Sequence, residues 1–117
     1  MDALSGRWRG WYGYGPGQGH HPMELVLSES AGKVVGGGMD DVGPFKIAGS
    51  RLHAVVRWAK SYSTHVVDYD GAYDGHFIRG IWRLKDGSAG DFCVWPDGAG
   101  PMKVESESRP EAEPKAA

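Results

Sequence analysis

Hydrophobic and polar residues alternate along most of this chain, and the alternation is clearest between Arg51 and Leu84. Three segments there, residues 54–58, 66–69 and 77–82, are rich in β-branched and aromatic side chains. Such side chains suit a pleated, half-buried surface, whereas glycines at 71, 75 and 80 would weaken any helix drawn through them. The pattern therefore predicts three successive β-strands joined by short turns.

The alternation also separates two faces. Every second residue forms an apolar and aromatic face, which comprises Leu52, Ala54, Val56, Trp58, His65, Val67, Tyr69, Gly71, Tyr73, Ile78, Gly80, Trp82 and Leu84. The opposite face carries the charged residues Arg57, Asp68, Asp70, Arg79 and Arg83. This arrangement is typical of an antiparallel sheet with one face on a core and the other in water.

The rest of the chain has the same character. Further strands are predicted at residues 4–14, 23–27, 34–38, 45–48 and 91–95, with Gly15–Gly19 as a loop and turns at 30–33, 39–44 and 85–88. Eight or so short strands at spacings of about 8–12 residues indicate an all-β sandwich or barrel. Sequential hairpins favour an antiparallel up-and-down barrel, closed by pairing of the first strand with the last.

Length and composition limit the alternatives. The 117 residues are enough for one domain, which we assign to residues 1–96. From residue 97 onward the chain is rich in Pro, Ser, Ala and mixed charge, which predicts a disordered C-terminal tail over 97–117. A formal net charge of −2 favours neither nucleic acid nor an anionic membrane as a partner.

Localisation is predicted from what the chain lacks. No apolar run approaches the ~20 residues of a membrane-spanning helix, and the N-terminus does not resemble a signal peptide. The single cysteine, Cys93, falls on the outward parity of its strand and is compatible with a reducing compartment. We therefore expect a cytoplasmic protein without membrane contact, and an unreactive Cys93.

Candidate reactive groups are few. His20 and His21 adjoin a glycine-rich loop without a third ligand at suitable spacing, so no metal site is predicted. Asp40 and Asp41 lack the spacing of a calcium loop and are better explained as turn residues. No catalytic residues and no cofactor are predicted, and the sequence leans against an enzyme.

Inward-facing tyrosines carry the strongest indication of function. A buried phenol needs a hydrogen-bond partner, so several phenols in one lumen leave polar groups for water or for a ligand. The predicted ligand-binding residues are Tyr12, Tyr14, His65, Tyr69, Tyr73 and Trp82. A small planar or aromatic ligand would suit them, although the same residues could form a wet core.

Two motifs resemble a known family. Gly6-Arg7-Trp8 resembles the G-x-W opening of the calycin barrels, and residues 56–62, with His65, 69–73, Ile78 and Trp82, are similar to the middle strands of avidin and streptavidin. The resemblance implies a closed barrel with a ligand site at one end. Gly10 and Tyr14 stand near the places where avidins have an Asn and a Ser, so biotin is not the expected ligand. The opening also resembles haem-binding nitrobindin barrels, without a matched proximal His.

Two functions follow from these features. The first is a non-enzymatic small-molecule-binding barrel. The alternative is a protein-interaction or assembly module, in which a solid barrel contacts a second copy or another protein through Trp11, Phe77 and Trp95, all on outward parities together with Ile81. An isomerase or cyclase in such a barrel is a third, less favoured, reading.

Overall fold

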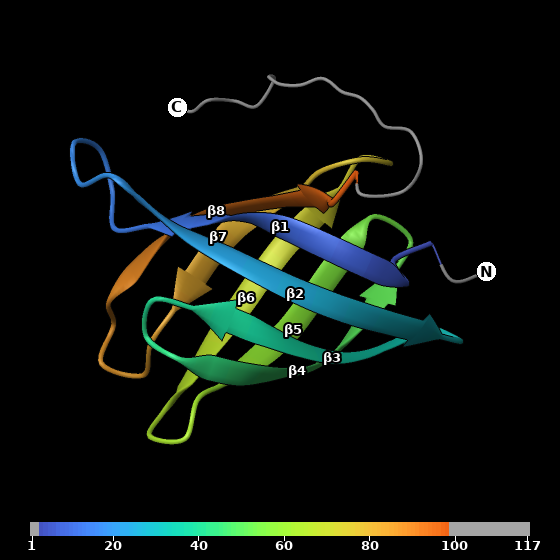
Figure 1. The fold of residues 1–117 in the computed structure, drawn as a ribbon, viewed down its shortest axis with the longest axis horizontal. Helices are drawn as coiled ribbons and strands as arrows, with labels where there is room; N and C mark the ends of the chain where they lie inside the picture. Colours follow the sequence, from blue (N-terminus) through green and yellow to red (C-terminus); the bar gives the residue numbers. More distant parts are fainter. Residues whose placement is uncertain (1–2, 99–117) are drawn as a thin grey trace.

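The fold is a closed antiparallel β-barrel (Figure 1), seen in a computed structural model that describes residues 3–98. The described residues form eight strands: β1 (Gly6–Gly13), β2 (His20–Ser30), β3 (Lys33–Asp40), β4 (Pro44–Leu52), β5 (Val55–Ser61), β6 (Val66–Tyr73), β7 (Ile78–Arg83) and β8 (Ala89–Pro96). Each strand pairs with its neighbour in sequence, and β1 pairs with β8 from Trp8↔Pro96 to Gly13↔Asp91. The predicted all-β, up-and-down closed barrel is confirmed.

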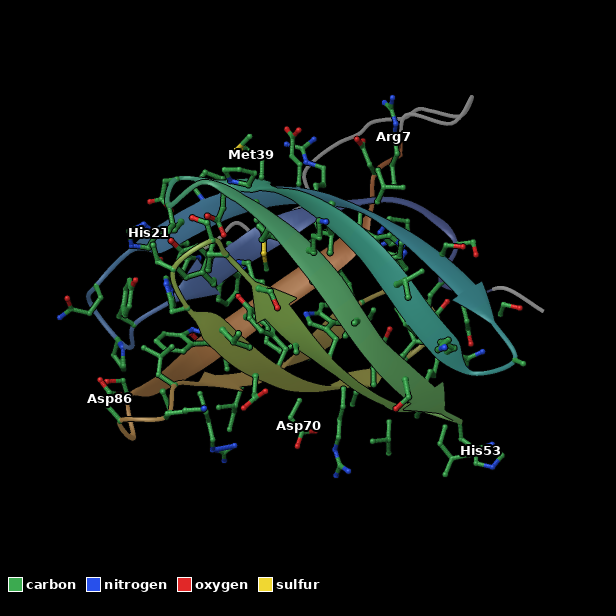
Figure 2. The ribbon with its side chains drawn as sticks, turned by 90° about the horizontal axis from the view of Figure 1, so that it is seen from below. Arg7, His21, Met39, His53, Asp70 and Asp86 are labelled. Atoms are coloured by element: carbon green, nitrogen blue, oxygen red, sulfur yellow. The ribbon has the colours of Figure 1, made fainter. Side chains whose placement is uncertain are left out.

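The strand connections define two ends of the barrel. One end, which we call the mouth, carries the connections at residues 14–19, 41–43, 62–65 and 84–88. The opposite end carries the N-terminal segment and the connections at 31–32, 53–54 and 74–77. Figure 2 shows His21 and Asp86 at the mouth and His53 at the opposite end. Because all strands run between the same two ends, residues distant in sequence meet at each of them.

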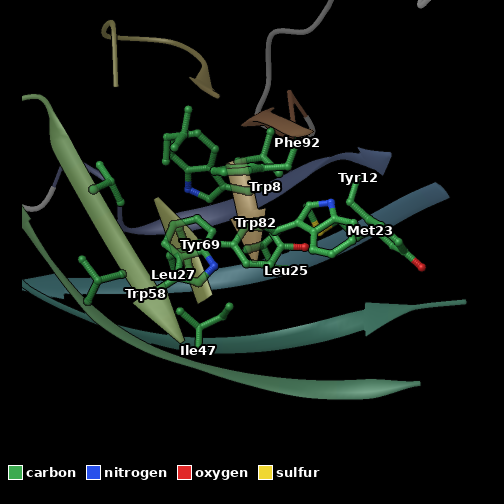
Figure 3. Packing of buried hydrophobic residues seen from close by; sticks show 14 of the residues in the cluster. Trp8, Tyr12, Met23, Leu25, Leu27, Ile47, Trp58, Tyr69, Trp82 and Phe92 are labelled. Carbon is green, nitrogen blue, oxygen red and sulfur yellow. The ribbon is translucent and has the colours of Figure 1, made fainter. Parts of the chain in front are cut away.

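Inward-facing side chains fill the barrel between these ends. The core combines aliphatic residues with several large rings, among them Trp8, Trp58, Tyr69, Trp82 and Phe92 (Figure 3). Trp58 stacks near Tyr69 with ring centroids 5.9 Å apart, and Phe92 tilts against both. A barrel of this strand number has an interior just wide enough for side chains or one small ligand. The rings of Trp58, Tyr69 and Phe92 occupy its middle, between Trp8 towards one end and Trp82 towards the other.

The end opposite the mouth is plugged. Leu4 is fully buried there, and its backbone carbonyl accepts a hydrogen bond from Trp8 Nε1 at 2.8 Å. The carboxylate of Glu29, only 4 % exposed, accepts from the Leu4 backbone N–H at 3.1 Å and pairs with Arg51 Nε at 2.8 Å. These bonds satisfy the polar groups that the plug buries. A small molecule could therefore reach the interior from the mouth.

Several predicted boundaries were wrong by a few residues. The predicted turn at 39–44 shrinks to 41–43 because Met39 and Asp40 still pair with β4 and β2. The first strand spans 6–13 rather than 4–14, and the second begins at His20 instead of Met23. Polar and glycine residues near a strand end look like loop residues in sequence, although the backbone ladder continues through them.

Two residues of the β4–β5 hairpin that were predicted to face inward are outside. Leu52 is 71 % exposed and Ala54 is exposed as well, because the β4–β5 hairpin turns between them. His53 there adopts a φ of 56°, a left-handed conformation that reverses the chain and ends the alternation. Cys93 does face outward as predicted, yet it is 7 % exposed under its neighbours, and burial raises the pKa of its thiol.

The C-terminal boundary is described only in part. Asp97 donates its backbone N–H to the Arg7 carbonyl at 2.8 Å, which extends ordered pairing one residue past β8. The predicted tail from residue 99 onward lies outside the described residues. Between residues 3 and 98, no helix is long and apolar enough to cross a membrane.

Glycines allow the closest strand approaches. A Cβ at Gly80 in β7 would lie 2.0 Å from the Asp70 carbonyl oxygen and 2.6 Å from Gly71 Cα. The contacted atoms are backbone, so they cannot move aside without disturbing the β6–β7 ladder. This glycine is required by close approach rather than by an unusual φ.

We expect Gly80→Ala to destabilise the barrel by about 2 kcal/mol or more, in the range of overpacked cores. Urea unfolding followed by tryptophan fluorescence measures the change. Ala72→Ser, on the exposed face of the neighbouring strand, is the matched control and should change the free energy of unfolding by less than about 0.5 kcal/mol. Equal effects of the two substitutions would show that the strands do not approach this closely at Gly80.

Candidate functional site

A small cavity opens at the mouth of the barrel. Its volume is about 50 Å³, and its lining comes from β1, β6 and β7 and from the connections at the mouth. Six of the lining residues carry rings: Tyr12, Tyr14, Tyr62, His65, Tyr69 and Trp82. Val42, Val67 and Leu84 complete the wall. Aromatic walls with a few polar groups are the usual composition of small-molecule sites.

The aromatic rings at the mouth pack against one another. Tyr14 stands edge-on to Trp82 and to Tyr12, with centroids 5.3 and 5.9 Å apart, respectively. Trp82 is fixed by a hydrogen bond of 2.9 Å from its Nε1 to the Gly13 carbonyl oxygen. Tyr14 itself is 52 % exposed and makes no side-chain hydrogen bond to another described residue. Tyr14 is thus the ring most free to move when something enters.

A buried ion pair lies beneath the mouth. Lys60, on the inner face of β5, is 1 % exposed, and its Nζ lies 2.5 Å from Asp40 Oδ2 at the end of β3. The same Asp40 oxygen accepts a hydrogen bond of 2.5 Å from the Tyr62 hydroxyl. Asp40 Oδ1 accepts from the backbone N–H groups of Val42 and Gly43, at 2.9 and 3.3 Å. Asp40 therefore joins the β3–β4 turn to the barrel interior.

The ammonium group of Lys60 is surrounded by rings. Its Nζ lies 4.4 Å from the ring centroid of Phe45, 4.8 Å from that of Tyr12 and 5.2 Å from those of Tyr62 and Tyr69. The negative faces of aromatic rings attract cations, which offsets part of the loss of water. Burial still lowers the pKa of Lys60, and the adjacent Asp40 opposes that shift.

The phenols near this pair stay protonated at neutral pH. Burial is the main cause that raises the pKa of Tyr12, Tyr62 and Tyr69 far above the usual value. Neighbouring carboxylates add to the shift, because a phenolate next to Asp40 or Asp41 would place two negative charges together. The three hydroxyl groups therefore act as hydrogen-bond donors rather than as bases.

A second carboxylate fastens the β3–β4 turn across the mouth. Asp41 accepts a short hydrogen bond from the Tyr12 hydroxyl and pairs with His21 Nδ1 at 2.6 Å. The hydrogen bond from Tyr12 is the largest cause that lowers the pKa of Asp41. Val42, the next residue, lines the cavity. The contacts of Asp41 hold this valine over the opening.

Five of the six predicted ligand residues lie around the cavity. Tyr12, Tyr69 and Trp82 are buried, whereas Tyr14 and His65 are exposed at the rim. Tyr73 does not join them, because it follows β6 to the opposite end, where it contacts Trp8 and Arg51. Residues 69 and 73 share a face of one strand, but four residues of extended chain place them near different ends.

Sequence reasoning missed the charged part of the site. Lys60 falls on the inward parity of Val56 and Trp58, and that position was the available signal for a buried lysine. Asp40 was explained as a turn residue, but it is the last residue of β3, and its carboxylate accepts from the turn that follows. Its pairing with Lys60, 20 residues further along the chain, has no signal in spacing. No set of three or more His, Cys, Asp or Glu residues within 3–98 is arranged to bind a metal.

The fold and the site define a closed eight-stranded barrel with one open, aromatic end. Comparison with known proteins adds no family to this description. No protein-family model matches the chain, and no curated protein is significantly similar to it.

Removal of Lys60 tests the buried ion pair. We expect Lys60→Met to cost about 3–5 kcal/mol of unfolding free energy, because it leaves the Asp40 carboxylate buried without a counter-charge. Adding Asp40→Asn to that variant should recover part of the loss. Chemical denaturation of the single and double variants measures both effects.

The control for this prediction is the exposed pair Arg57–Asp70 on β5 and β6, with 3.3 Å between Nε and Oδ2. Both side chains are more than half exposed, so Arg57→Met should change stability by less than about 1 kcal/mol. If Lys60→Met were as mild as Arg57→Met, the Lys60–Asp40 pair would not be buried in solution.

Acid should weaken the contacts through which Asp41 holds the β3–β4 turn. Because the pKa of Asp41 is lower in the folded chain than its usual 3.8, its contribution to stability is present above that pH and is lost as the pH falls through the folded-state value. Asp41→Asn should therefore be less stable than the parent chain at pH 7, and at a pH below 3.8 the difference should be smaller. Urea midpoints at both pH values, with Asp68→Asn as control, measure this. A constant difference would contradict it.

Proposed function

We propose that this protein is a non-enzymatic binding barrel that takes a small planar ligand at its mouth. The observation that carries the proposal is the asymmetry of the two ends. One end is plugged by Leu4 and the Glu29–Arg51 pair, whereas the other holds a ring-lined cavity with phenol groups at its base. Rigid rings supply contact area at low entropic cost, and a few polar groups fix orientation.

The resemblance to calycin barrels supports the same proposal. A closed barrel whose interior communicates with solvent at one end is the scaffold on which such proteins bind ligands. The polar residues in this chain differ from those of the avidins, with Gly10 facing a backbone carbonyl and Tyr14 at the rim. We accordingly propose that biotin binds weakly or not at all, and that the ligand is another planar molecule.

A second candidate, a protein-interaction module, is favoured by the outer face of β1, β8 and β7. Trp11 and Arg79 flank Cys93 across the sheet, and Phe77 stands edge-on to Trp95 at 6.0 Å. These rings are partly exposed, and Cys93 on the same face is buried. Tryptophan and arginine are enriched where protein interfaces carry most of their binding energy. A partner or a second copy bound there would leave the mouth free.

Filling the cavity distinguishes the two candidates. Val67 points into the cavity from β6, whereas Val66 beside it is 45 % exposed on the outside. We expect Val67→Phe to abolish binding of planar small molecules and Val66→Phe to leave it unchanged. Native mass spectrometry of the purified chain, followed by NMR titration of whatever co-purifies, measures the loss.

Both variants should remain folded, which thermal unfolding checks. Binding that survives Val67→Phe but is lost on Trp95→Lys would place the interaction on the outer face and favour the protein-interaction module. A molecule bound equally by both valine variants and by Trp95→Lys would contradict both candidates.

A further inference from the structure

We propose that the mouth cavity receives an uncharged carbonyl oxygen, and that Tyr69, positioned by Lys60, donates the hydrogen bond to it. This inference rests on the ligand-binding function proposed above and names the chemical class of the ligand. It follows from the hydrogen-bond directions, the charges and the volume of the cavity.

The N–H donors of Lys60 set the direction of its hydrogen bond with Tyr69. An ammonium group has three N–H donors and accepts nothing. In this barrel its Nζ faces Asp40 Oδ2 at 2.5 Å, the Tyr69 hydroxyl oxygen at 3.1 Å and Met23 Sδ at 3.5 Å. The Tyr69 oxygen is consequently an acceptor in its contact with Lys60. Its own proton must point elsewhere.

Tyr69 carries the one buried phenol proton at the cavity that no described residue accepts, whereas the hydroxyl of Tyr14 is exposed to water at the rim. The Tyr12 proton goes to Asp41 and the Tyr62 proton to Asp40. No described residue accepts the proton of Tyr69, whose side chain is buried and lines the cavity. A buried hydroxyl that lacks an acceptor is costly, so an acceptor entering the cavity gains this hydrogen bond. The site therefore selects a ligand that carries an acceptor.

The charged groups around the cavity disfavour an ionic ligand. Two carboxylates, those of Asp40 and Asp41, lie beside the cavity and face Lys60 and His21. An anionic ligand would lose its hydration and then be repelled by these carboxylates. An ammonium ligand would be repelled by Lys60, and it has only hydrogen-bond donors, so it cannot accept the proton of Tyr69. An uncharged carbonyl avoids both costs, because it needs little desolvation and still accepts from Tyr69.

The volume of the cavity limits which part of a ligand can enter it. A cavity of about 50 Å³ accommodates a carbonyl group but is too small for an aromatic ring. For comparison, a cavity known to hold a benzene molecule has a volume of ~150 Å³. The ring of the ligand would therefore lie at the rim, between Val42 and the exposed ring of Tyr14. Aromatic amides and ketones have this shape, with a planar body and a carbonyl at one edge.

Three matched probes test the inference: benzamide, benzoate and benzylammonium. They share one ring and differ in the charge and hydrogen bonding of the substituent. Each is titrated to ~10 mM into the full 117-residue chain and followed by NMR, because fragments of this size bind in the millimolar range. Benzamide should shift the resonances of Trp82 Nε1–H and Leu84 at the mouth, with an affinity at least about 5-fold above that of either charged probe.

Substitution of the phenols supplies the control. Tyr69→Phe should weaken benzamide by about 5-fold or more and leave the weak binding of the charged probes unchanged. Tyr73→Phe, which removes the phenol at the plugged end, should leave all three affinities unchanged. Lys60→Gln should reverse the preference towards benzylammonium, because it frees the Asp40 carboxylate. A merely structural role of Lys60 would lower all three affinities together.

The outcomes separate the two proposals. Equal binding of the three probes at the mouth, or unchanged benzamide affinity in Tyr69→Phe, would overturn the carbonyl inference and leave the ligand-binding function standing. Absence of any shift at the mouth with all three probes would overturn both. If Lys60→Gln does not fold, the comparison of Tyr69→Phe with Tyr73→Phe still decides the role of Tyr69.

Discussion

Hydrogen bonding between the first and last strands is the constraint on which the rest of this structure depends. Pairing of β1 with β8 removes both sheet edges and encloses a fixed volume. That volume has to be filled by inward side chains, because open space in a core costs free energy. Large rings fill the middle, Leu4 closes one end, and the remaining space appears as the cavity at the mouth. The position of the candidate site is thus a consequence of closure and unequal filling.

The Lys60–Asp40 pair explains why the mouth is organised rather than loose. A buried charge is tolerated only when its partner and its remaining hydrogen bonds are supplied, and here they come from β3, β5, β6 and the β3–β4 turn. Replacing such a pair with apolar residues is often neutral or stabilising, so stability alone does not account for its presence. The proposed role in directing the hydroxyl of Tyr69 would account for a pair that is costly to desolvate.

The fold could be predicted from sequence because its signal is local. Alternation of period two and turn residues every 8–12 positions identify strands, and short connections allow few topologies. The residues of the site were harder. Tyr12, Tyr69 and Trp82 could be placed inside by parity, but parity does not tell how far along the barrel a residue lies, so Tyr73 was grouped with them. The Asp40–Lys60 and Asp41–Tyr12 contacts join distant segments, which no local pattern encodes.

The two sides of the mouth differ in how firmly their rings are held, and for the proposed ligand this difference indicates the side from which it enters. Trp82 is held by Gly13, and Tyr12 by Asp41, so these rings form a fixed wall. Tyr14 is half exposed and touches that wall only edge-on. On the proposal above, a ligand ring at the rim packs between Val42 and Tyr14, and Tyr14 shifts to receive it at little cost in side-chain order. The turn that carries Val42 would stay closed, because only a carbonyl group has to pass beneath it.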